Sequence, residues 1–515
     1  MTRETCKGVI AAGHPRTVEA AAQILQAGGN AFDAVVAAHL AACVAEPVLA
    51  SLGGGGYLLA RQGQQARIYD FFVQTPKRRR PPESLDFYPI QADFGTAKQE
   101  FHIGLGAVAT PGVVRGLWRM QKSLGRMSMT EVAQPAIQLA RDGVVVNAFQ
   151  AYVFDIVAPI YRARPETFAA YRSPTRPDRL VQEGDLLIQP QLADSLEALA
   201  REGDTLFYEG DIARRIVELC RQGGLLEQDD LRDYALERRR PLRLTYRNAT
   251  ILTNPPPSSG GILIAFALKL LEPFQLSRAD FGSPAHLKHL AGVQAVTQNA
   301  RRELDLDETH AGGTPGILAP EMLGHYREKL RLHPLCRRGT THISIMDRDG
   351  NIASLTTSNG EGCGWLIPDT GIMLNNMLGE ADLNPHGFYR WPCDTRMTSM
   401  MAPTIAQLPH QTVALGSGGS NRLRTAILQV LINLIDFGMP LSEAVSAPRL
   451  HFEDDVINLE DGFEETVVAQ LASYYPIKRW PGRNLFFGGV HAVASKADRF
   501  DATGDPRRGG ASQIV

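Results

Sequence analysis

Thr340 stands where a threonine could become a catalytic nucleophile. It follows Gly339 and opens a strand-like stretch, Thr341 to Met346. A threonine hydroxyl is a weak nucleophile until a base takes its proton. An N-terminal threonine carries that base as its own α-amino group, whose reference pKa is ~7.7–8.0. Thr340 gains this amine only if the Gly339–Thr340 bond is cut, most simply by attack of its own hydroxyl on the preceding carbonyl. Gly339 suits that attack because it has no Cβ and tolerates a strained approach.

The residues after Thr340 predict a β-hairpin. Residues 341–346 and 352–356 alternate in the manner of strands, and Asp347-Arg348-Asp349-Gly350-Asn351 between them is typical of a turn. The region 308–339 has no clear pattern and is rich in Gly, Pro, Arg and His, so we expect a mobile linker there. The nucleophile candidate would thus lie where a linker meets the first residue of a core strand.

Other elements must surround this hairpin. We expect a buried strand over 8–12, a helix from about 18 to 27 capped by Thr17, and a second helix from Ala31 to Ala45. The four glycines 53–56 lead into a core strand, and helical patterns dominate from about 112 to 235. Farther on, we expect a strand within 242–252 and an apolar helix over 262–271. No internal repeat marks a domain boundary.

Composition excludes several classes of function. The net charge is −2, from 53 basic and 55 acidic residues, which argues against a broad nucleic-acid-binding surface. We interpret two basic runs, 77–80 and 238–240, as solvated loop charge. Six dispersed cysteines without a C-x-x-C pair indicate free thiols and neither a zinc site nor a disulfide framework. No apolar signal region or run of about 18 apolar residues appears, so we expect no membrane span and a cytoplasmic protein.

The sequence from Gly339 through the hairpin to Met377 resembles the start of the small subunit of gamma-glutamyltransferases. The likeness extends in order over nearly the whole chain. Its other segments are Glu19-Ala20-Ala21, Gly28 to Ala34, Glu46-Pro47, Gly53 to Gly56, Thr110-Pro111-Gly112, Ala140 to Gly143, Phe207-Tyr208, Pro255 to Gly261, Ala402-Pro403-Thr404 and Ala447-Pro448-Arg449.

This resemblance implies an α+β fold of the N-terminal nucleophile hydrolase type, a four-layer αββα sandwich. It also implies a proenzyme that cuts itself into a large subunit of residues 1–339 and a small subunit of residues 340–515, which together form one intertwined heterodimer; a higher assembly is left open. Thr340 would form an acyl-enzyme on a small-molecule amide or γ-glutamyl substrate, and water or an amine acceptor would resolve it. No cofactor or metal is implied.

The resemblance also implies roles for supporting residues. Thr356 and Ser358 would place hydroxyls near Thr340, and Gly418-Gly419-Ser420 resembles the family's oxyanion loop, whose N–H groups meet the charge that develops in the transition state. Substrate contacts would come from three further residues: Glu380, Asp382 and Ser399. Taken without that context, each hydroxyl fits an ordinary strand residue and the glycine loop fits a plain turn.

Several positions depart from the family pattern. The family binds the glutamyl α-carboxylate with an arginine after Asp-Phe, but here Phe72 follows Asp70-Phe71. A charge clamp is thus replaced by an apolar ring. The family's asparagine falls at Gly360, its glutamine at Met377, and its second serine at Met400 after Ser399. These departures indicate retained chemistry with altered substrate recognition.

Several hypotheses therefore remain open. The leading one is γ-glutamyl hydrolysis or transfer on glutathione-like compounds, and next is the same chemistry on a non-glutamyl amide. Glu361 and Arg422 would then either contact the substrate or face solvent. A non-catalytic binding relative is a third hypothesis, and a metal hydrolase is a fourth. The best local ligand cluster for a metal is Asp305, Asp307, Glu308 and His310, whose spacing matches no defined motif. Gly53 to Gly56 lack the Gly-Lys-Ser/Thr of a phosphate-binding loop.

Overall fold

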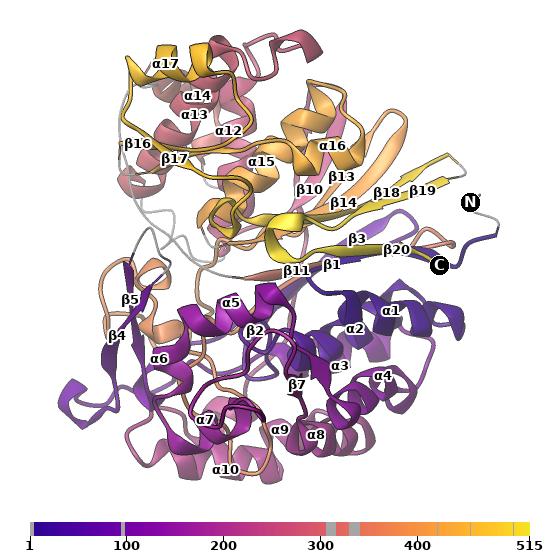
Figure 1. Cartoon of the computed structure of the whole chain (residues 1–515), viewed down its shortest axis with the longest axis vertical. Helices are drawn as coiled ribbons and strands as arrows, with labels where there is room; N and C mark the ends of the chain where they lie inside the picture. Colours follow the sequence, from indigo (N-terminus) through magenta and orange to yellow (C-terminus); the bar gives the residue numbers. More distant parts are fainter. Residues whose placement is uncertain are drawn as a thin grey trace.

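Two stacked β-sheets lie between two layers of helices in a computed structural model of the chain (Figure 1). The structure describes residues 5–93, 98–304, 316–328, 340–419, 421–453, 455–497 and 499–515. Each sheet buries one face against the other sheet and the opposite face against helices, as packed layers require. The predicted four-layer αββα sandwich is confirmed.

The first sheet carries the predicted nucleophile hairpin at its centre. Among the described residues it has seven strands, all paired antiparallel. Their order is β20 (Ala511–Ile514), β1 (Gly8–Ala12), β11 (Thr341–Asp347), β12 (Ile352–Ser358), β2 (Gly55–Gln62), β3 (Gln65–Phe71) and β8 (Glu237–Arg239). Every residue of β11 and β12 is buried, so the hairpin is held from both sides.

The second sheet lies above the first and supplies the loop that faces Thr340. Its described strands run in the order β19 (Arg499–Thr503), β18 (Gly489–Lys496), β14 (Gln411–Gly418), β13 (Thr404–Leu408), β10 (Ala249–Thr253) and β9 (Leu242–Tyr246). In the first sheet, β11 and β12 from after position 340 lie between β1 and β2 from before it. In the second sheet, β13 from after this position pairs with β10 from before it. The two predicted subunits would therefore share both sheets.

Helices close both outer faces (Figure 1). The first sheet is covered by α1 (Pro15–Gln26), α2 (Ala31–Ala45), α3 (Val113–Leu124), α4 (Met129–Asp142) and α8 (Pro190–Glu202). The second is covered by α12 (Ser259–Leu271), α13 (Pro284–Glu303), α15 (Asn421–Ile435) and α16 (Leu441–Ser446). All of α2 is buried, and a reciprocal capping box between Asn30 and Asp33 fixes its start.

Smaller elements fill the periphery. The helices are α5 (Ala148–Ile156), α6 (Ala158–Tyr161), α7 (Pro165–Tyr171), α9 (Thr205–Tyr208), α10 (Asp211–Cys220), α11 (Gln228–Arg232), α14 (Pro320–Glu328) and α17 (Glu465–Ala472). The strands are β4 (Tyr88–Asp93), β5 (Lys98–Ile103), β6 (Val144–Val145), β7 (Leu186–Leu187), β15 (Leu450–Glu453), β16 (Val456–Glu460) and β17 (Ile477–Trp480).

The strand over 8–12, the helix from Ala31 to Ala45 and the hairpin are confirmed. The cap of the first helix was predicted wrongly. The helix begins at Pro15, because the ring of His14 accepts the Arg16 N–H at 3.1 Å. Thr17 instead lies inside the helix and donates its hydroxyl to Glu46. Residues 242–252 belong to two strands, β9 and β10, joined by a turn at Arg247, whose φ is 51°.

The linker prediction is wrong for part of 308–339. Residues 316–328 form a short 3-10 turn, Gly316–Leu318, and helix α14, which packs Tyr326 edge-on against Phe266 of α12. The remainder of that prediction lies outside the described residues, as does Gly339.

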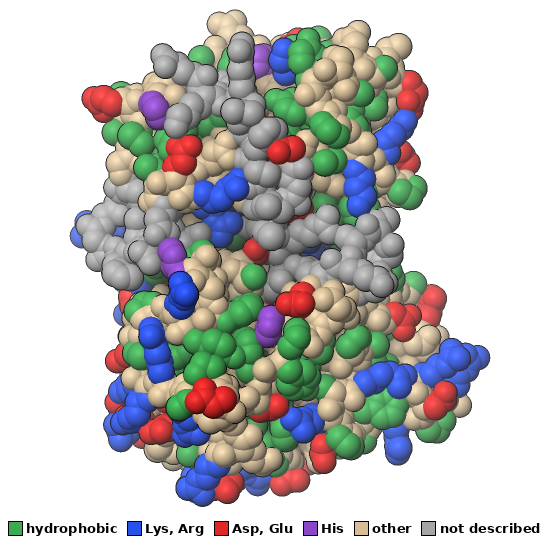
Figure 2. All heavy atoms as spheres, turned by 90° about the vertical axis from the view of Figure 1, so that its left-hand side faces the viewer, with side chains coloured by type: hydrophobic (Ala, Val, Ile, Leu, Met, Phe, Trp, Pro, Cys, Tyr) green, Lys and Arg blue, Asp and Glu red, His purple; other side chains and the backbone are tan. Residues whose placement is uncertain are grey.

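The basic runs were also predicted wrongly in part. Arg239 is not solvated: it forms an ion pair of 2.7 Å with Asp70, a fully buried carboxylate. In the other run, Arg78 pairs with Glu227 and Asp229. Figure 2 shows acidic and basic side chains intermixed over the described part of one face.

Free thiols are found at the five cysteines that the structure describes, of which Cys393 is exposed and the others are buried. Cys336 lies outside the described residues. Within the described part of the chain, no helix is long and apolar enough to cross a membrane.

Candidate active site

Thr340 lies directly before β11, buried between the two sheets with 5% of its surface exposed. Its carbonyl oxygen accepts a hydrogen bond of 3.2 Å from the guanidinium of Arg508. Gly418 packs against the same carbonyl so closely that a Cβ there would come within 1.6 Å of the oxygen. Thr340 also lines a pocket between the sheets. The carbonyl group of the predicted nucleophile is therefore held by Arg508 and Gly418, and the residue lines a cavity.

Thr356 lies on the same face of the hairpin as Thr340 and is oriented by a histidine. It pairs across the strands with His342, and its hydroxyl lies 2.8 Å from Nδ1 of that ring. The other ring nitrogen, Nε2, lies 2.9 Å from the Ser344 hydroxyl, which itself donates to the carbonyl of His491. Because the Ser344 proton is used, Nε2–H must donate and Nδ1 must accept from Thr356. Burial lowers the pKa of His342, which keeps the ring neutral as this arrangement requires.

Ser358 ends β12 and lines the same pocket as Thr340. Its hydroxyl oxygen accepts the N–H of Gly360 at 3.0 Å. Gly360 has a φ of +62°, and a Cβ at this position would lie 2.0 Å from the Asn376 amide oxygen and 2.3 Å from Glu380 Oε1. An asparagine side chain, which the family pattern has at this position, would therefore collide with Asn376 and Glu380.

The glycine loop that follows β14 lies beside Thr340, as the resemblance implied. Gly418 ends the strand against the Thr340 carbonyl, and Gly419 adopts a φ of +118°, where a side chain would be strained. The Gly419 carbonyl accepts the N–H of Arg422 in the first turn of α15. Ser420 lies outside the described residues.

A buried carboxylate, Glu46, lies on the opposite side of the hairpin. It accepts the hydroxyls of Thr17 at 2.8 Å and Thr341 at 3.4 Å. Burial raises the pKa of Glu46 to about 7, although both hydroxyls and the charge of Arg508 oppose the rise. Burial also lowers the pKa of Arg508, to about 10. A titrating group thus contacts the residue next to the predicted nucleophile.

Apolar and acidic side chains share the pocket that Thr340 lines. Its remaining lining residues are Phe72, Ser358, Met377, Glu380, Asp382, Leu383, Ser399, Met400, Met401 and Leu423. The predicted contact residues Glu380, Asp382 and Ser399 are therefore brought together with Thr340. No lysine, arginine or histidine is among the described residues that line this pocket.

Phe72 is a fixed part of this pocket wall. It is 1% exposed and stacks on Tyr57, with ring centroids 5.5 Å apart. Its carbonyl accepts the Tyr234 hydroxyl at 2.7 Å and a guanidinium N–H of Arg396. The preceding Asp70 is held by Arg239 and accepts the Phe72 N–H. Hydrogen bonds and an ion pair thus hold the Asp70-Phe71-Phe72 segment, and an apolar ring stands at its third position.

Glu361 and Arg422 are both buried, at 7% and 4% exposure, so neither faces solvent. They line a small, largely apolar cavity together with Gly360, Phe149 and Arg508. The guanidinium of Arg422 stacks on Phe486 at 4.5 Å from the ring centroid. Glu361 and Arg422, which were predicted as alternative substrate contacts, therefore line a different cavity from the one that Thr340 lines.

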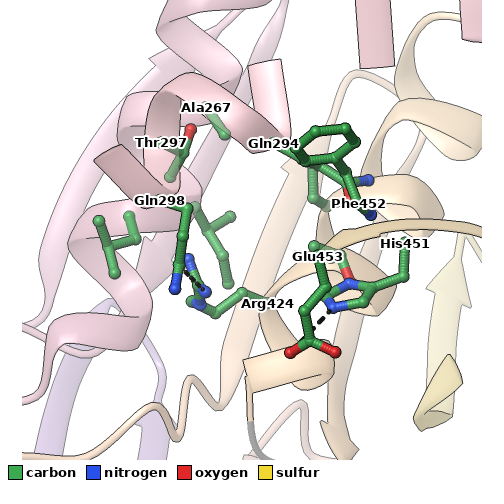
Figure 3. Close-up of a pocket in the computed structure, with 12 residues that line it drawn as sticks. Ala267, Gln294, Thr297, Gln298, Arg424, His451, Phe452 and Glu453 are labelled. Atoms are coloured by element: carbon green, nitrogen blue, oxygen red, sulfur yellow. Dashed lines mark hydrogen bonds and ion pairs between the residues drawn. The ribbon is translucent and has the colours of Figure 1, made fainter. Parts of the chain in front are cut away.

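A second polar cavity lies between α12, α13, α15 and β15 (Figure 3). His451 and Glu453 face Gln298 and Arg424 across it, and Arg424 donates to Gln298 at 2.7 Å. Its volume of about 20 Å³ suits a single water molecule.

The predicted metal-ligand cluster of Asp305, Asp307, Glu308 and His310 lies outside the described residues. Within the described ranges, no group of three or more His, Cys, Asp or Glu side chains is arranged to hold a metal ion.

Known proteins resemble this chain in sequence and in fold. The family model described as Gamma-glutamyltranspeptidase matches residues 17–515. The chain belongs to the gamma-glutamyltranspeptidase family. The resemblance proposed from the sequence is therefore confirmed, and with it the assignment to enzymes of the N-terminal nucleophile hydrolase and transferase type.

Relatives within the gamma-glutamyltranspeptidase family carry two kinds of name. An acylase ACY 1 proenzyme of Pseudomonas sp. (strain V22) is 33% identical, over 96% of this chain and 90% of the relative. A glutathione hydrolase proenzyme of Escherichia coli (strain K12) is 31% identical, over 90% and 84% of the two chains. Among solved structures, the cephalosporin acylase of Bacillus halodurans matches with a TM-score of 0.83 at 22% identity, over 99% of this chain and 96% of that one. This likeness confirms the fold.

Proposed function

We propose that this protein is an amide hydrolase or acyl transferase that cuts its own chain before Thr340 and then uses Thr340 as its nucleophile. The observation that carries the proposal is the position of Thr340, at the start of a central strand, facing a pocket and bordered by Gly418. Relatives named as proenzymes support the cleavage. The products would be fragments 1–339 and 340–515, held together by the sheets they share.

The proposed reaction needs only groups of this chain. The free α-amine of Thr340 takes the proton of its own hydroxyl, and the hydroxyl oxygen bonds to the amide carbon of the substrate. N–H groups of the loop at Gly418 and Gly419 are the proposed donors to the developing oxyanion, a contribution of several kcal/mol where such donors are fixed. The amine leaves with a proton, and water or a second amine then attacks the acyl-enzyme. Thr356, oriented by His342, would steer the α-amine.

For the acyl group, the described lining of the Thr340 pocket favours one without a free carboxylate. A γ-glutamyl group carries an α-carboxylate, and burying it without a cation is costly. The described lining offers Phe72, Met377 and Met400 instead of a basic residue. A relative named acylase agrees with an amide of this kind.

A γ-glutamyl substrate is the second candidate, because Glu380 and Asp382 line the pocket and could pair with the substrate's amino group. Phe72→Arg tests it. If the missing clamp is what limits γ-glutamyl turnover, this variant should hydrolyse a γ-glutamyl anilide faster than the unmodified protein does. An unchanged rate would favour the first candidate, provided that circular dichroism shows the variant to be folded.

Thr340→Ala tests the nucleophile directly. We expect an uncut chain that hydrolyses none of a panel of fatty-acyl, dicarboxyl and γ-glutamyl anilides on which the unmodified protein is active. Thr340→Ser keeps a hydroxyl and an α-amine and should retain part of the activity. Full activity in Thr340→Ala would overturn the proposal. A chelator should leave the activity intact, since no step uses a metal. A cytoplasmic location remains a prediction.

A further inference from the structure

The side chain of Arg508 reaches from the C-terminal end of the chain to the predicted nucleophile. It belongs to a 3-10 turn, Pro506–Arg508, and is 4% exposed. Its Nη1 donates to the carbonyl oxygen of Thr340 at 3.2 Å, and its Nη2 donates to the carbonyl of Leu485 at 3.5 Å. The proposed reaction assigns no role to this guanidinium.

The same guanidinium packs on the glycine loop. A Cβ at Gly418 would lie 3.1 Å from its Nη1, and a Cβ at Gly419 would lie 3.2 Å from its Nη2. The stem of Arg508 crosses Gly489 of β18, where a Cβ would come within 2.6 Å of the Arg508 Cδ. Because these three positions are glycines, one side chain contacts both the nucleophile residue and the loop that is proposed to bind the oxyanion.

Arg508 differs from the arginines near it in the way its charge is held. Arg449 and Arg507 pair with Asp505 at 2.7 and 3.2 Å, and Arg507 also pairs with Glu460. Within the described part of the chain, the guanidinium of Arg508 donates to two carbonyl oxygens and to no carboxylate. A buried cation without a carboxylate partner is unfavourable for folding, so stability alone does not account for this arrangement.

Other charged or titratable groups lie around Arg508 and Thr340. They are Glu46 after α2, Arg422 of α15, Arg449 and Asp505, His342 of β11, His491 of β18, and the carboxylates of Glu361, Glu380 and Asp382. Both histidines are neutral at pH 7, because burial lowers the pKa of His491 to about 4 and also lowers the pKa of His342. Arg508 stays charged, since burial lowers its pKa only to about 10.

A cation bound to the Thr340 carbonyl also lies close to the amine that cleavage would release. The amine nitrogen and the carbonyl oxygen of one residue are only about 3 Å apart. A nearby positive charge disfavours the ammonium form and lowers the pKa of an amine. The carboxylate of Glu46, which contacts Thr341, has the opposite effect. The two charges together would therefore set the pH at which the amine becomes a base.

We propose that Arg508 is a positioning residue of the nucleophile, which holds the Thr340 carbonyl against the glycine loop and keeps the Thr340 amine unprotonated at neutral pH. The proposal rests on the proposed function. It gives Arg508 no contact with the substrate, so its loss should change kcat and the pH dependence of the reaction and leave KM nearly unchanged.

The pH profile of kcat/KM tests this role, because it reports the pKa of the free enzyme's base. The substrate is an uncharged anilide that the unmodified protein hydrolyses. We expect Arg508→Gln to move the acidic limb to higher pH by about one unit and to lower kcat about tenfold, with less than about a twofold change in KM. The direction follows because an amine without the neighbouring cation holds its proton to higher pH.

Two further variants separate charge from shape. Arg508→Lys keeps the positive charge, so its acidic limb should stay within about 0.3 pH units of the original. In the double variant Glu46→Gln/Arg508→Gln, the limb should lie between those of the two single variants, because the two charges oppose each other. Arg201→Gln removes an exposed arginine of α8 and is the control that should change neither kcat nor the profile.

Two results would overturn this role: an acidic limb of Arg508→Gln at the same or a lower pH than in Arg201→Gln, or an equal upward shift in Arg508→Lys. If Arg508→Gln stays uncut, Arg508→Lys decides: cleavage and a limb that stays in place support the role, and an uncut chain overturns it. These failures leave the nucleophile untouched, because Thr340→Ala tests it separately. An active Thr340→Ala protein would instead reject the proposed function.

Discussion

The hydroxyl of Thr356 lies 2.8 Å from Nδ1 of His342, and the two residues face each other across the central hairpin. Because Ser344 fixes the other ring nitrogen as a donor, the histidine can only accept from Thr356. The lone pairs of Thr356 are then left for another donor. In the proposed mechanism that donor is the α-amine of Thr340.

His342→Ala should therefore lower kcat by up to about tenfold with little change in KM, since the loss of one hydrogen bond corresponds to ~0.5–1.5 kcal/mol. His342→Asn offers an amide oxygen near the place of Nδ1 and should recover part of the rate. Steady-state kinetics of the three proteins check this. Equal kcat values in all three would mean that Thr356 is oriented without the histidine.

Gly418→Ala should give an inactive chain that is uncut or poorly folded. A Cβ at this position would come within 1.6 Å of the Thr340 carbonyl oxygen, so the strand and the nucleophile cannot both keep their places. Gly324→Ala is the matched control, because that helical glycine has open space around it. The control should be active and slightly more stable, by about 0.5–1 kcal/mol. Normal cleavage and activity in Gly418→Ala would contradict this geometry.

Gly360→Ala should destabilise the protein by about 1–3 kcal/mol in denaturant unfolding. Two effects contribute: the φ of +62°, and the contacts of a Cβ with Asn376 and Glu380. Gly63→Ala separates them, because Gly63 has a φ of +57° and a Cβ added there would meet no atom within 4 Å. If the two variants lose equal stability, the crowding at Gly360 has no effect.

Glu46→Gln should move the acidic limb of the pH profile of kcat/KM to lower pH, by up to about one unit. The pKa of Glu46 is about 7, so the carboxylate is negative above neutrality. A negative charge one residue away favours the ammonium form of the Thr340 amine and raises the pKa of that amine. Removing the charge lets the amine act as a base at lower pH. Glu19→Gln, an exposed change in α1, should leave the profile in place; a limb that moves upward in Glu46→Gln would contradict the assignment.

Sequence reasoning succeeded where short-range pattern determines structure. The alternation around Asp349-Gly350 predicted β11 and β12, and a run rich in Ala and Val predicted α2. The contact between Glu46 and Thr341 could not be predicted from short-range pattern, because the two residues are 295 positions apart in the chain. The position of His342 beside the site could have been predicted from the sequence, because a residue two positions after Thr340 in a strand lies on the same face.

The specificity of the site was less predictable. The sequence showed that Phe72 departs from the family pattern. Its stacking on Tyr57 and the crowding around Gly360 could not be predicted, because they depend on segments far apart in the chain. Arg508 lies 168 positions after Thr340, and only the fold brings its guanidinium to the Thr340 carbonyl. The basic run at 77–80 looked uniform because sequence alone does not reveal which of its charges finds a partner.

Intact mass spectrometry combined with N-terminal sequencing of the purified protein tests the central claim most directly. The account predicts two fragments in equal amounts, the smaller beginning Thr-Thr-His-Ile-Ser, and a single uncut chain for Thr340→Ala. An unmodified protein that is active as one uncut chain, or one cut at another bond, would contradict Thr340 as an N-terminal nucleophile.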